Sequence, residues 1–553
     1  MSLSDLLVAA KAELDLRPET VFVCKGLNQQ VCLVLSVTDG SERAVVLHQV
    51  DQSVNQAWLS LVKKTRMLLE KKKIAPKWLR IDWVDQVFPN TWSSLKQHIE
   101  GSKRNYFRKG IALDASFEHL FLEQELNANA MLYGGADIPH AVINQKNFAS
   151  YAKQRYPHLT LDFSADHPVF SFTTQAIFVE ANQPVQALIS KGRDSGRRVI
   201  DQLSPPVVEK LIANSSQFLA KQVKKNGRFV YGIHPCFDRR VNSYNALRHA
   251  STTYSMLEAW EVTQNPDLKR SIDRSLDYLT STLIKNYRLD KGQEVAFLVD
   301  VADEIKLGGN AVCLLALVKY TELTEDEQYL GLLEKLAKGI QSMQDQSTGQ
   351  FLHVLNATDL SVKQAFRIIY YDGEAAFGLM RLYGLTRDER WIKIVEKAFD
   401  YFIAKEHWRI HDHWLSYCVN ELTIYRPEKK YYQFGIDNVK DHLDFVANRI
   451  TTYPTLLELM MAAHKMISRI QTQPEFEALL AQIDLPQFYQ ALEKRAHYLL
   501  NGYFWPEFAM YFKHPNSIVG SFFIRHHSFR VRIDDVEHYL SGYVAYLQHY
   551  INR

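Results

Sequence analysis

The sequence has few cysteines, and their spacing indicates no structural role that they share. Its 553 residues contain five cysteines, an odd number with no Cys-x-x-Cys pair. We therefore expect neither a disulfide framework nor a zinc knuckle, and scattered thiols of this kind favour a cytoplasmic protein. The five positions are Cys24, Cys32, Cys236, Cys313 and Cys418.

Long apolar runs are also missing. No window approaches the roughly 20 uninterrupted apolar residues that cross a bilayer. The first residues, MSLSDLLVAAKAELD, place Asp5, Lys11 and Glu13 among their apolar positions, unlike the basic and apolar regions of a secretory signal. We expect a protein with no membrane span and no secretory signal.

Nor does one sign of charge dominate. Lys plus Arg number 65 and Asp plus Glu number 62, which gives a formal net charge of +3. Composition therefore predicts neither nucleic acid nor an anionic membrane as a partner. The chain does contain 46% hydrophobic and 23% charged residues, as an average folded protein does. Because it is too long for one ordinary core, at least two domains are expected.

Residues 1–195 have the pattern of an α+β domain. Short runs such as QVCLVLSV, WLRIDWV and VFSFTTQAIFVEA predict strands, and residues 54–72 and 117–133 predict helices. No phosphate loop or dinucleotide fingerprint occurs among them, so the sequence leaves the role of this domain open. The segment SKGRDSGRRVIDQLSPP (190–206) combines Gly, Ser, Pro and basic residues and predicts the domain boundary.

From residue 205 to 553 two kinds of helix alternate. Charged, amphipathic helices are predicted at 205–225, 267–285, 327–344, 389–405 and 488–504, with a weaker candidate at 428–447. Between them lie apolar helices at 246–262, 307–323, 370–386, 411–425, 451–466 and 536–550. Helices that are apolar on most faces are buried, so the alternation predicts a mainly α (α/α)6 toroid. An irregular helical domain or an open solenoid is the alternative, although the unequal repeat lengths favour a closed ring.

The motifs of this region resemble a known superfamily. The segments YNALRHASTTYSMLEAWE, EIKLGGNAVCLLALVKY and YYDGEAAFGLMRLY, in this order, resemble the six-hairpin, glycosidase-like toroids. That superfamily includes glycoside hydrolases, polysaccharide lyases and sugar epimerases, so the resemblance implies a carbohydrate-active enzyme. Terpene cyclases share a related toroid but use a DxDD motif, where this chain has Arg532-Ile533-Asp534-Asp535. The Cys/His zinc set of lanthionine cyclases is also missing.

In such a toroid the inner helices run in one direction, so their N-termini and their positive dipole ends meet at one rim. We expect Glu374 to be the catalytic acid or base, because burial in the first turn of an apolar helix raises the pKa of a carboxyl group. Asp300 or Asp303 is expected to supply a second carboxylate for glycoside chemistry, and His249 a further proton-transfer group. The residues expected to bind substrate are Arg248, Asn310, Tyr371, Asp372, Trp414, Arg449, Tyr453, Arg530, Arg532, Asp535 and His538.

Several of these residues have structural alternatives. Asp372 can cap its helix while Glu374 complements the helix dipole. The acids at 300–304 can form a solvated loop, and the Arg and Asp residues at 530–535 can form ion pairs that close the ring between the last and first repeats. The histidine-containing segments HDHW (411–414) and RHHSFRVRIDDVEH (525–538) match no known metal-ligand motif, so we expect no metal and no other cofactor.

The sequence thus predicts an enzyme of the glycoside hydrolase, polysaccharide lyase or sugar epimerase type, acting by carboxylate acid–base chemistry. Arginines and positive helix ends at one rim favour an anionic saccharide, such as one that contains uronate. Fold does not fix function, so a non-catalytic component that binds a glycan or a partner, or a cyclase-like toroid, is the alternative. The exact substrate, the choice among the three reactions and the oligomeric state are not predicted.

Overall fold

The computed structural model describes residues 2–552, which form two compact units. Unit 1 runs to Asp201 and includes two later segments, Ile233–Val241 and Asn501–Val531. Unit 2 consists of Gln202–Gly232, Asn242–Leu500 and the residues from Arg532 onward. The two later segments of unit 1 differ from the boundaries expected from sequence, which placed them in the helical region. Within residues 2–552, no helix is both long and apolar enough to cross a membrane.

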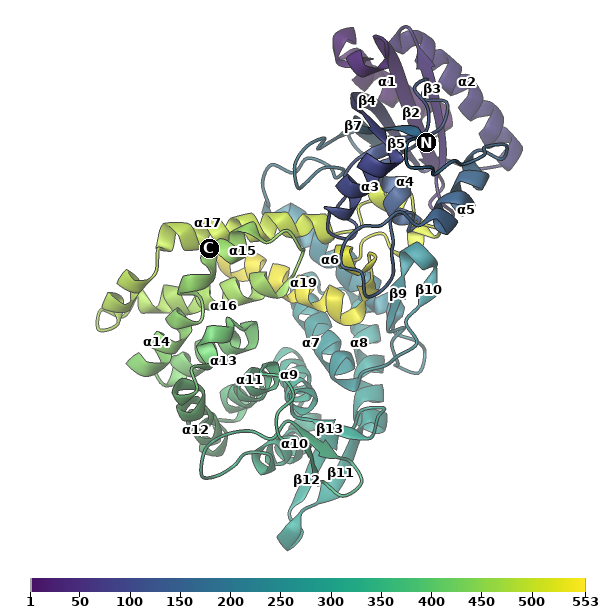
Figure 1. Cartoon of the computed structure of the whole chain (residues 1–553). Helices are drawn as coiled ribbons and strands as arrows, with labels where there is room; N and C mark the ends of the chain where they lie inside the picture. Colours follow the sequence, from purple (N-terminus) through teal and green to yellow (C-terminus); the bar gives the residue numbers. More distant parts are fainter. Residues whose placement is uncertain (1, 553) are drawn as a thin grey trace. The chain divides into compact units, whose positions relative to one another are not determined.

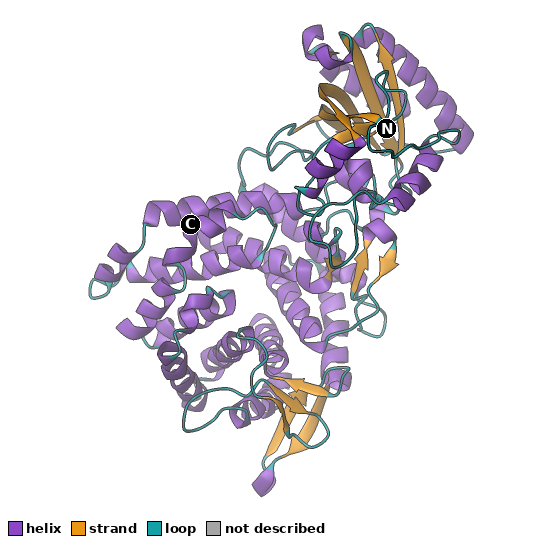
Figure 2. Ribbon diagram, in the orientation of Figure 1, coloured by secondary structure: helices purple, strands orange, loops and turns teal. Residues whose placement is uncertain are grey.

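Unit 1 is built on eight strands: β1 (Val23–Cys24), β2 (Gln30–Thr38), β3 (Val45–Asp51), β4 (Trp78–Thr91), β5 (Gly110–Ala112), β6 (Leu120–Phe121), β7 (Pro168–Glu180) and β8 (Gln186–Leu188). They pair antiparallel in the order β1-β2-β4-β7-β5-β6, with β3 beside β2 and β8 beside β7 (Figure 2). The apolar run of β2 is buried from Val31 to Thr38, because a strand with few polar side chains is stable only when both of its faces are covered.

The helices of unit 1 are α1 (Leu3–Asp15), α2 (Val54–Lys72), α3 (Trp92–Glu100), α4 (Glu123–Ala128), α5 (Gln145–Arg155) and α18 (Pro506–Ala509). The helix predicted at 54–72 is present as α2. The helix predicted at 117–133 is wrong in extent, because Leu120 and Phe121 pair with β5 and only α4 is helical. Phe117 also has a φ of 57°, which no helix residue adopts.

A buried ion pair explains why the segment 501–531 belongs to unit 1. Arg80 and Asp82 on β4 are 1% and 0% exposed, and Arg80 Nη2 lies 2.8 Å from Asp82 Oδ1. The same guanidinium donates to the carbonyl of Glu507 at 3.0 Å, and Tyr511 donates to Ser36 of β2 at 2.9 Å. Contacts this distant in sequence leave no local pattern, so the sequence did not reveal them.

Unit 2 contains six inner helices: α7 (Ala246–Thr263), α9 (Leu307–Thr324), α11 (Tyr370–Thr386), α13 (His413–Tyr425), α16 (Thr455–Ile470) and α19 (Ile533–Tyr546). Each packs against the next, and α19 packs against α7, so the helices form a closed ring (Figure 1). All six were predicted. The start of α16 is displaced from 451 to Thr455 because Pro454 disfavours helical conformation in the residue before it.

The outer helices are α6 (Pro205–Gln222), α8 (Pro266–Tyr278), α10 (Leu330–Ser342), α12 (Glu389–Ala404), α14 (Lys429–Asp437), α15 (Leu443–Asn448) and α17 (Leu485–Tyr498). They match the predicted amphipathic helices, and α14 with α15 replaces the weak candidate at 428–447. Short strands complete the fold: β9 (Gly232–His234), β10 (Arg239–Arg240), β11 (Ile284–Arg288), β12 (Glu294–Leu298), β13 (Glu304–Lys306), β14 (Val354–Asn356), β15 (Val362–Gln364) and β16 (Val531–Arg532).

The inner helices are parallel, since their first turns touch one another. Arg248 of α7 forms an ion pair with Asp534 of α19, and Gly308 of α9 lies against Glu374 of α11. The first turn of α11 packs on that of α13, which is hydrogen-bonded to α16. The N-terminal ends therefore meet at one rim of unit 2, as the alternation predicted.

The buried ion pair of unit 1 gives a stability prediction. Asp82→Asn leaves the Arg80 guanidinium buried without a counter-charge, which costs about 3 kcal/mol. We expect calorimetry to show a clearly lower melting temperature for this variant. Asp15→Asn is the control, because it removes only an exposed i,i+4 partner of Lys11 and should leave the melting temperature unchanged. Equal melting temperatures for the two variants would contradict the prediction.

Candidate functional site

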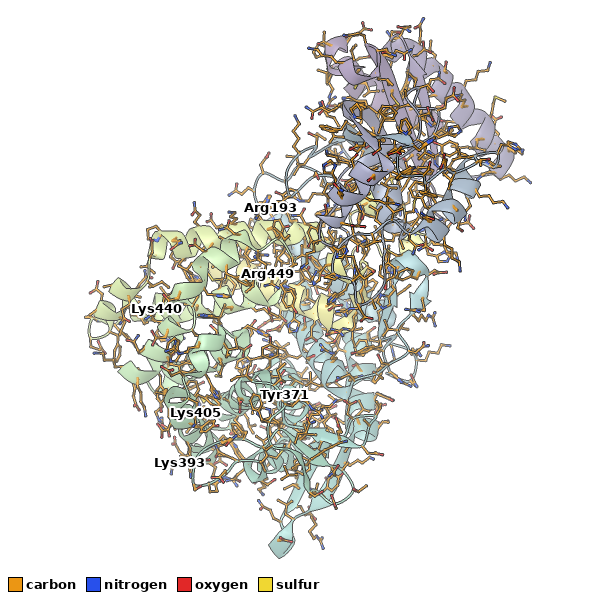
Figure 3. The ribbon with its side chains drawn as sticks, in the orientation of Figure 1. Arg193, Tyr371, Lys393, Lys405, Lys440 and Arg449 are labelled. Carbon is orange, nitrogen blue, oxygen red and sulfur yellow. The ribbon has the colours of Figure 1, made fainter. Side chains whose placement is uncertain are left out.

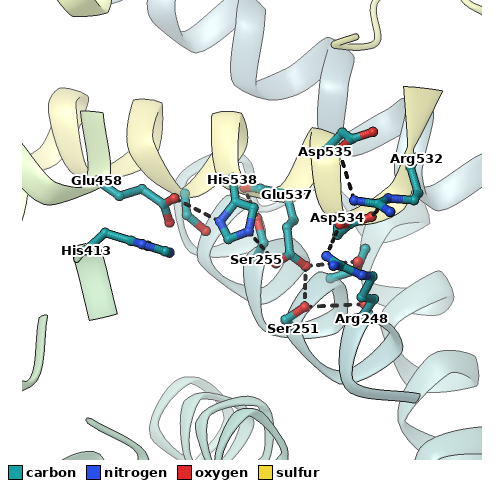
Figure 4. A network of polar contacts seen from close by, with 12 residues as sticks. Arg248, Ser251, Ser255, His413, Glu458, Arg532, Asp534, Asp535, Glu537 and His538 are labelled. Carbon is teal, nitrogen blue, oxygen red and sulfur yellow. Dashed lines mark hydrogen bonds and ion pairs between the residues drawn. The ribbon is translucent and has the colours of Figure 1, made fainter. Parts of the chain in front are cut away.

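Two histidines and a glutamate meet where α13, α16 and α19 begin. One nitrogen or oxygen atom each from His413, Glu458 and His538 lies within 4.8 Å of the others. Nδ1 of His538 lies 2.8 Å from Glu458 Oε2, and the two imidazole rings meet edge-on with centroids 5.4 Å apart (Figure 4). His538 was expected at this rim, but Glu458 was not.

The charge of His538 is set by its carboxylate neighbours. Burial alone would lower its pKa, but the carboxylates of Glu458 and Glu537 outweigh burial and raise the pKa to about 9. Nε2 of His538 lies 3.7 Å from Glu537 Oε1. At neutral pH this imidazole therefore carries a proton, which it can give to a substrate.

Glu537 lies one residue earlier on the same helix and faces α7. Its Oε2 accepts hydrogen bonds from Ser251 at 2.6 Å and from Thr252 at 3.0 Å. Burial raises the pKa of Glu537 to about 7, although His538 and these hydroxyls oppose the change. This carboxyl group is therefore close to half-protonated at neutral pH, which suits proton transfer.

Glu374 is the fifth residue of α11, just after the first turn in which it was expected, and is only 5% exposed. Burial and the carboxylate of Asp412 raise its pKa well above the ordinary value, against the opposing effect of Arg248. Among the described residues, none is hydrogen-bonded to its Oε2. Gly308 makes room for this group, because a Cβ atom there would lie 1.8 Å from Oε2. Burial thus favours the protonated form of Glu374, and its catalytic role stays a prediction.

Asp300 and Asp303 were expected to pair with Glu374, but each lies in a different environment. Asp300 accepts from the backbone N–H of Ala246 at 3.1 Å and forms an ion pair with Lys306, so it ties the start of α7 to the loop before α9. Asp303 is exposed, in a left-handed turn with a φ of 52°. These positions do not support the expected carboxylate pair.

His249 is also placed differently from the expectation. It is fully buried, and its Nε2 donates to the carbonyl of Ser275 on the outer helix α8 at 2.9 Å. Its Nδ1 lies 2.7 Å from the Tyr244 hydroxyl, and burial lowers its pKa to about 4. Both ring nitrogens are used in packing against the outer layer, so His249 is a structural residue and the predicted catalytic role is corrected.

The arginines of the rim are paired. Arg532 forms ion pairs with Asp534 and Asp535, and Asp534 also pairs with Arg248 (Figure 4). These contacts join the last repeat to the first, which was the structural alternative for this segment. Arg248 and Arg532 therefore have carboxylate partners within the network, and the expected anionic ligand stays a prediction.

Two further arginines lie apart from this network. Arg449, labelled in Figure 3, donates to Thr451 at 2.6 Å, and its guanidinium lies 4.9 Å from the ring centroid of Tyr453. Arg530 belongs to unit 1. The expected set of substrate-binding arginines is therefore not a single cluster within unit 2.

The remaining expected residues divide into packing and rim positions. Asn310 accepts from the N–H of Leu298 and donates to the carbonyl of Lys306, both at 2.8 Å, which fixes the start of α9. Asp372 lies 3.3 Å from His353 and does not cap α11. Tyr371, labelled in Figure 3, is 8% exposed, and burial raises its pKa to about 12.

Trp414 packs beside the histidine pair. Its ring centroid lies 5.0 Å from that of His413 and 6.4 Å from that of His538. An indole ring in this position excludes water from the imidazoles and offers a flat apolar face. Trp414 is therefore the expected substrate-binding residue that the structure brings closest to the histidines.

Two of the site residues missed by sequence reasoning share a detectable signal. Glu458 is the single acid in the apolar helix TLLELMMAAH, and Glu537 follows two acids at the start of α19. An acid that stands alone in a buried helix needs a partner, and Glu374 was found in that way. The partner itself comes from another helix and cannot be read from the local sequence.

The donor set His413, Glu458 and His538 is of the type that binds zinc. Metal ligation requires a neutral imidazole with a free lone pair, so a metal ion and a proton would compete for His538. The expectation of no metal stays a prediction.

Comparison with known proteins adds little to this picture. No family model matches the sequence, and no curated protein matches it significantly. Similar solved structures include a cellobiose 2-epimerase from Bacillus thermoamylovorans B4167 (13% identity, 62% of this chain and 97% of that chain, TM-score 0.46), a D-mannose isomerase (12%, 63% and 99%, 0.47) and an α-1,6-mannanase from Salegentibacter sp. HEL1_6 (10%, 61% and 98%, 0.42). TM-scores below 0.5 leave the chemistry and substrate of this chain open.

The Glu458–His538 pair predicts how stability depends on pH. A histidine whose pKa rises from 6.5 to about 9 on folding stabilises the fold below pH 6.5, and this contribution is lost as the pH rises through 9. In Glu458→Gln the neutral amide no longer favours the charged imidazole. We expect the melting temperature of this variant to fall less between pH 6.5 and 9, by a difference on the order of 1–3 kcal/mol in stability.

Glu477→Gln is the control for this measurement, because Glu477 is exposed at the surface of unit 2. Its melting temperature should follow the pH dependence of the unmodified protein. The same pH slope in the Glu458→Gln variant would show that the pair does not hold the proton.

Proposed function

We propose that unit 2 is an enzyme that moves a proton on a carbon atom of a saccharide, as a sugar epimerase or isomerase does. The observation that supports it is the pair of imidazoles at one rim, with centroids 5.4 Å apart and a carboxylate hydrogen-bonded to one of them. A charged imidazole that can give a proton and a second ring nitrogen that can accept one are what stepwise removal and return of a proton requires.

Each residue of the pair has a separate role in the proposed reaction. His538, held protonated by Glu458, gives a proton, and His413 takes one, since no described residue is hydrogen-bonded to its buried Nε2. Loss of a proton from the carbon next to a carbonyl forms an enediolate, and return of a proton to either carbon or either face gives the isomer or the epimer. Glu374, whose protonated form is favoured by burial, donates a hydrogen bond to the developing oxyanion.

The substrate class rests on the resemblance of the sequence to carbohydrate-active toroids. Trp414 and Tyr371 are aromatic side chains of the kind on which a sugar ring packs, and 6% and 8% of their surfaces remain exposed. The paired arginines give no reason to expect an anionic sugar, so we propose a neutral aldose or a short saccharide with a free reducing end, in which the carbonyl group is available.

Glycoside hydrolysis is the second candidate, and the raised pKa of Glu374 favours it. A glycosidase needs a second, ionised carboxylate across the scissile bond, but Glu458 is engaged by His538 and Tyr417. Hydrolysis and epimerisation differ in a directly measurable way, because only proton transfer at carbon exchanges hydrogen with the solvent.

The experiment is incubation of the full chain with aldoses, reducing disaccharides and uronate-containing oligosaccharides in D2O. NMR should show deuterium on the carbon next to the carbonyl, together with the epimer or the ketose. New reducing ends without deuterium would identify a hydrolase, and an unchanged substrate panel would contradict both candidates.

Substitution of the histidines tests the roles of the pair. His538→Asn and His413→Asn should each lower kcat by about 10²–10⁴-fold, because an amide cannot exchange a proton near neutral pH. The control is His158→Asn, an exposed residue of unit 1, with normal turnover expected. If either site variant keeps normal turnover, its histidine is not a proton-transfer group.

Substitution of Gly308 tests whether the position of the Glu374 carboxyl group matters for turnover. In Gly308→Ala the new methyl group would lie 1.8 Å from Glu374 Oε2 and 2.6 Å from Tyr371 Cδ1, so it must displace both side chains. We expect kcat to fall and, because the site is overpacked, the melting temperature to fall as well. Gly309→Ala is matched in residue type and helix, and its nearest neighbour would be Leu298 at 3.1 Å. Equal kinetics for these two variants would argue against a role for Glu374.

A further inference from the structure

Unit 1 contains a cavity of about 430 Å³ that the reaction proposed for unit 2 does not use. It lies between the segment after α3, the strand β7 and the loop that follows β8. Its walls include Arg108, Lys109, Thr173, Lys191 and Ser195. A volume of this size accommodates a small organic molecule and exceeds what a single ion needs.

The cavity is lined by positive charge. Arg108, Lys109 and Lys191 line it, and none of the described residues that line it is acidic. Lys109 Nζ lies over the Phe88 ring, 3.6 Å from the centroid, and burial lowers the pKa of Lys109. Two of these cations have an acid nearby outside the lining, because Lys191 Nζ lies 4.0 Å from Asp85 Oδ2 and Arg108 Nε lies 3.4 Å from Glu123 Oε1. The side chain of Lys191 is 71% exposed and can move toward a ligand.

Hydroxyl groups accompany the charges. Thr173 Oγ1 is buried, and none of the described residues is hydrogen-bonded to it. The Ser195 hydroxyl lies 3.2 Å from Arg108 Nε, and Arg108 also donates to the Ser195 carbonyl, which fixes the guanidinium at the wall. Lysine, arginine and hydroxyl donors together are the groups that bind phosphate oxygens.

The glycines of the loop permit this arrangement. Gly192 and Gly196 have φ of 78° and 91°, which residues with a side chain rarely adopt. A Cβ on Gly196 would lie 3.3 Å from Arg108 Nη2, whereas one on Gly192 would meet nothing within 4 Å. The close turn at Gly196 brings the serine backbone onto Arg108. Arg193, labelled in Figure 3, lies in the same loop.

We propose that this cavity binds a small phosphorylated molecule, with the phosphate held by Lys109, Lys191 and the hydroxyl of Thr173. The excess of cations without an acid among the lining residues favours an anion, and the volume leaves room for an organic part beyond the phosphate. This site lies wholly within unit 1 and does not depend on the function proposed for unit 2.

Calorimetric titration of the full chain tests this site, with glucose 6-phosphate, inorganic phosphate and glucose as probes. We expect saturable binding of glucose 6-phosphate, weaker binding of inorganic phosphate and none of glucose at that site. Lys109→Gln and Lys191→Gln should each weaken glucose 6-phosphate binding by about tenfold, since each removes one charge next to the phosphate.

Lys146→Gln is the matched control, as Lys146 is an exposed lysine on α5 outside the cavity lining. It should bind glucose 6-phosphate as the unmodified protein does, and circular dichroism should show all three variants folded. No saturable binding of either phosphate probe, or equal weakening in the control, would overturn the proposal. If Lys109→Gln and Lys191→Gln bind normally, the phosphate lies elsewhere and the assignment fails.

Discussion

Closure of the helical ring is the constraint on which the candidate site depends. The chain enters α19 only after it has passed through unit 1, and the ion pair of Asp534 with Arg248 then joins the last inner helix to the first. Asp534 is 2% exposed, so its charge is stable only with such partners. The same closure brings Glu537 to the hydroxyls of α7 and His538 to Glu458 of α16. Ring closure and assembly of the site are therefore one structural event.

The alternation of inner and outer helices could be predicted because it depends on the local sequence. Helical periodicity and the low charge of the inner segments depend on neighbours three or four residues away. The helix starts also depend on local sequence, because the side chains of Asn245 and Asp412 cap α7 and α13. With the helices parallel, the rim position of Glu374 and His538 follows from their place near the helix starts, without knowledge of any contact.

Contacts between helices were not predictable in this way. Asp300 and His249 stand close to helix starts in sequence, yet Asp300 bonds to the start of a different helix and His249 turns to the outer layer. Glu458 has no polar neighbour in sequence, and its partner lies 80 residues away. Likewise, Arg80 fixes the segment that contains Glu507 from a separation of 427 residues. A single sequence shows which residues need a partner but not which residue supplies it.

Burial has opposite consequences for the acids and for the histidine of the site. In a low-dielectric surrounding a lone carboxyl group retains its proton, which is why the pKa of Glu374 and that of Glu537 are raised. His538 would lose its proton for the same reason, but the carboxylate of Glu458 at 2.8 Å reverses this effect. A proton donor and groups able to exchange protons are thus held next to one another at neutral pH. This difference comes from the partners that each helix supplies, and it is the basis on which proton transfer is proposed for this rim.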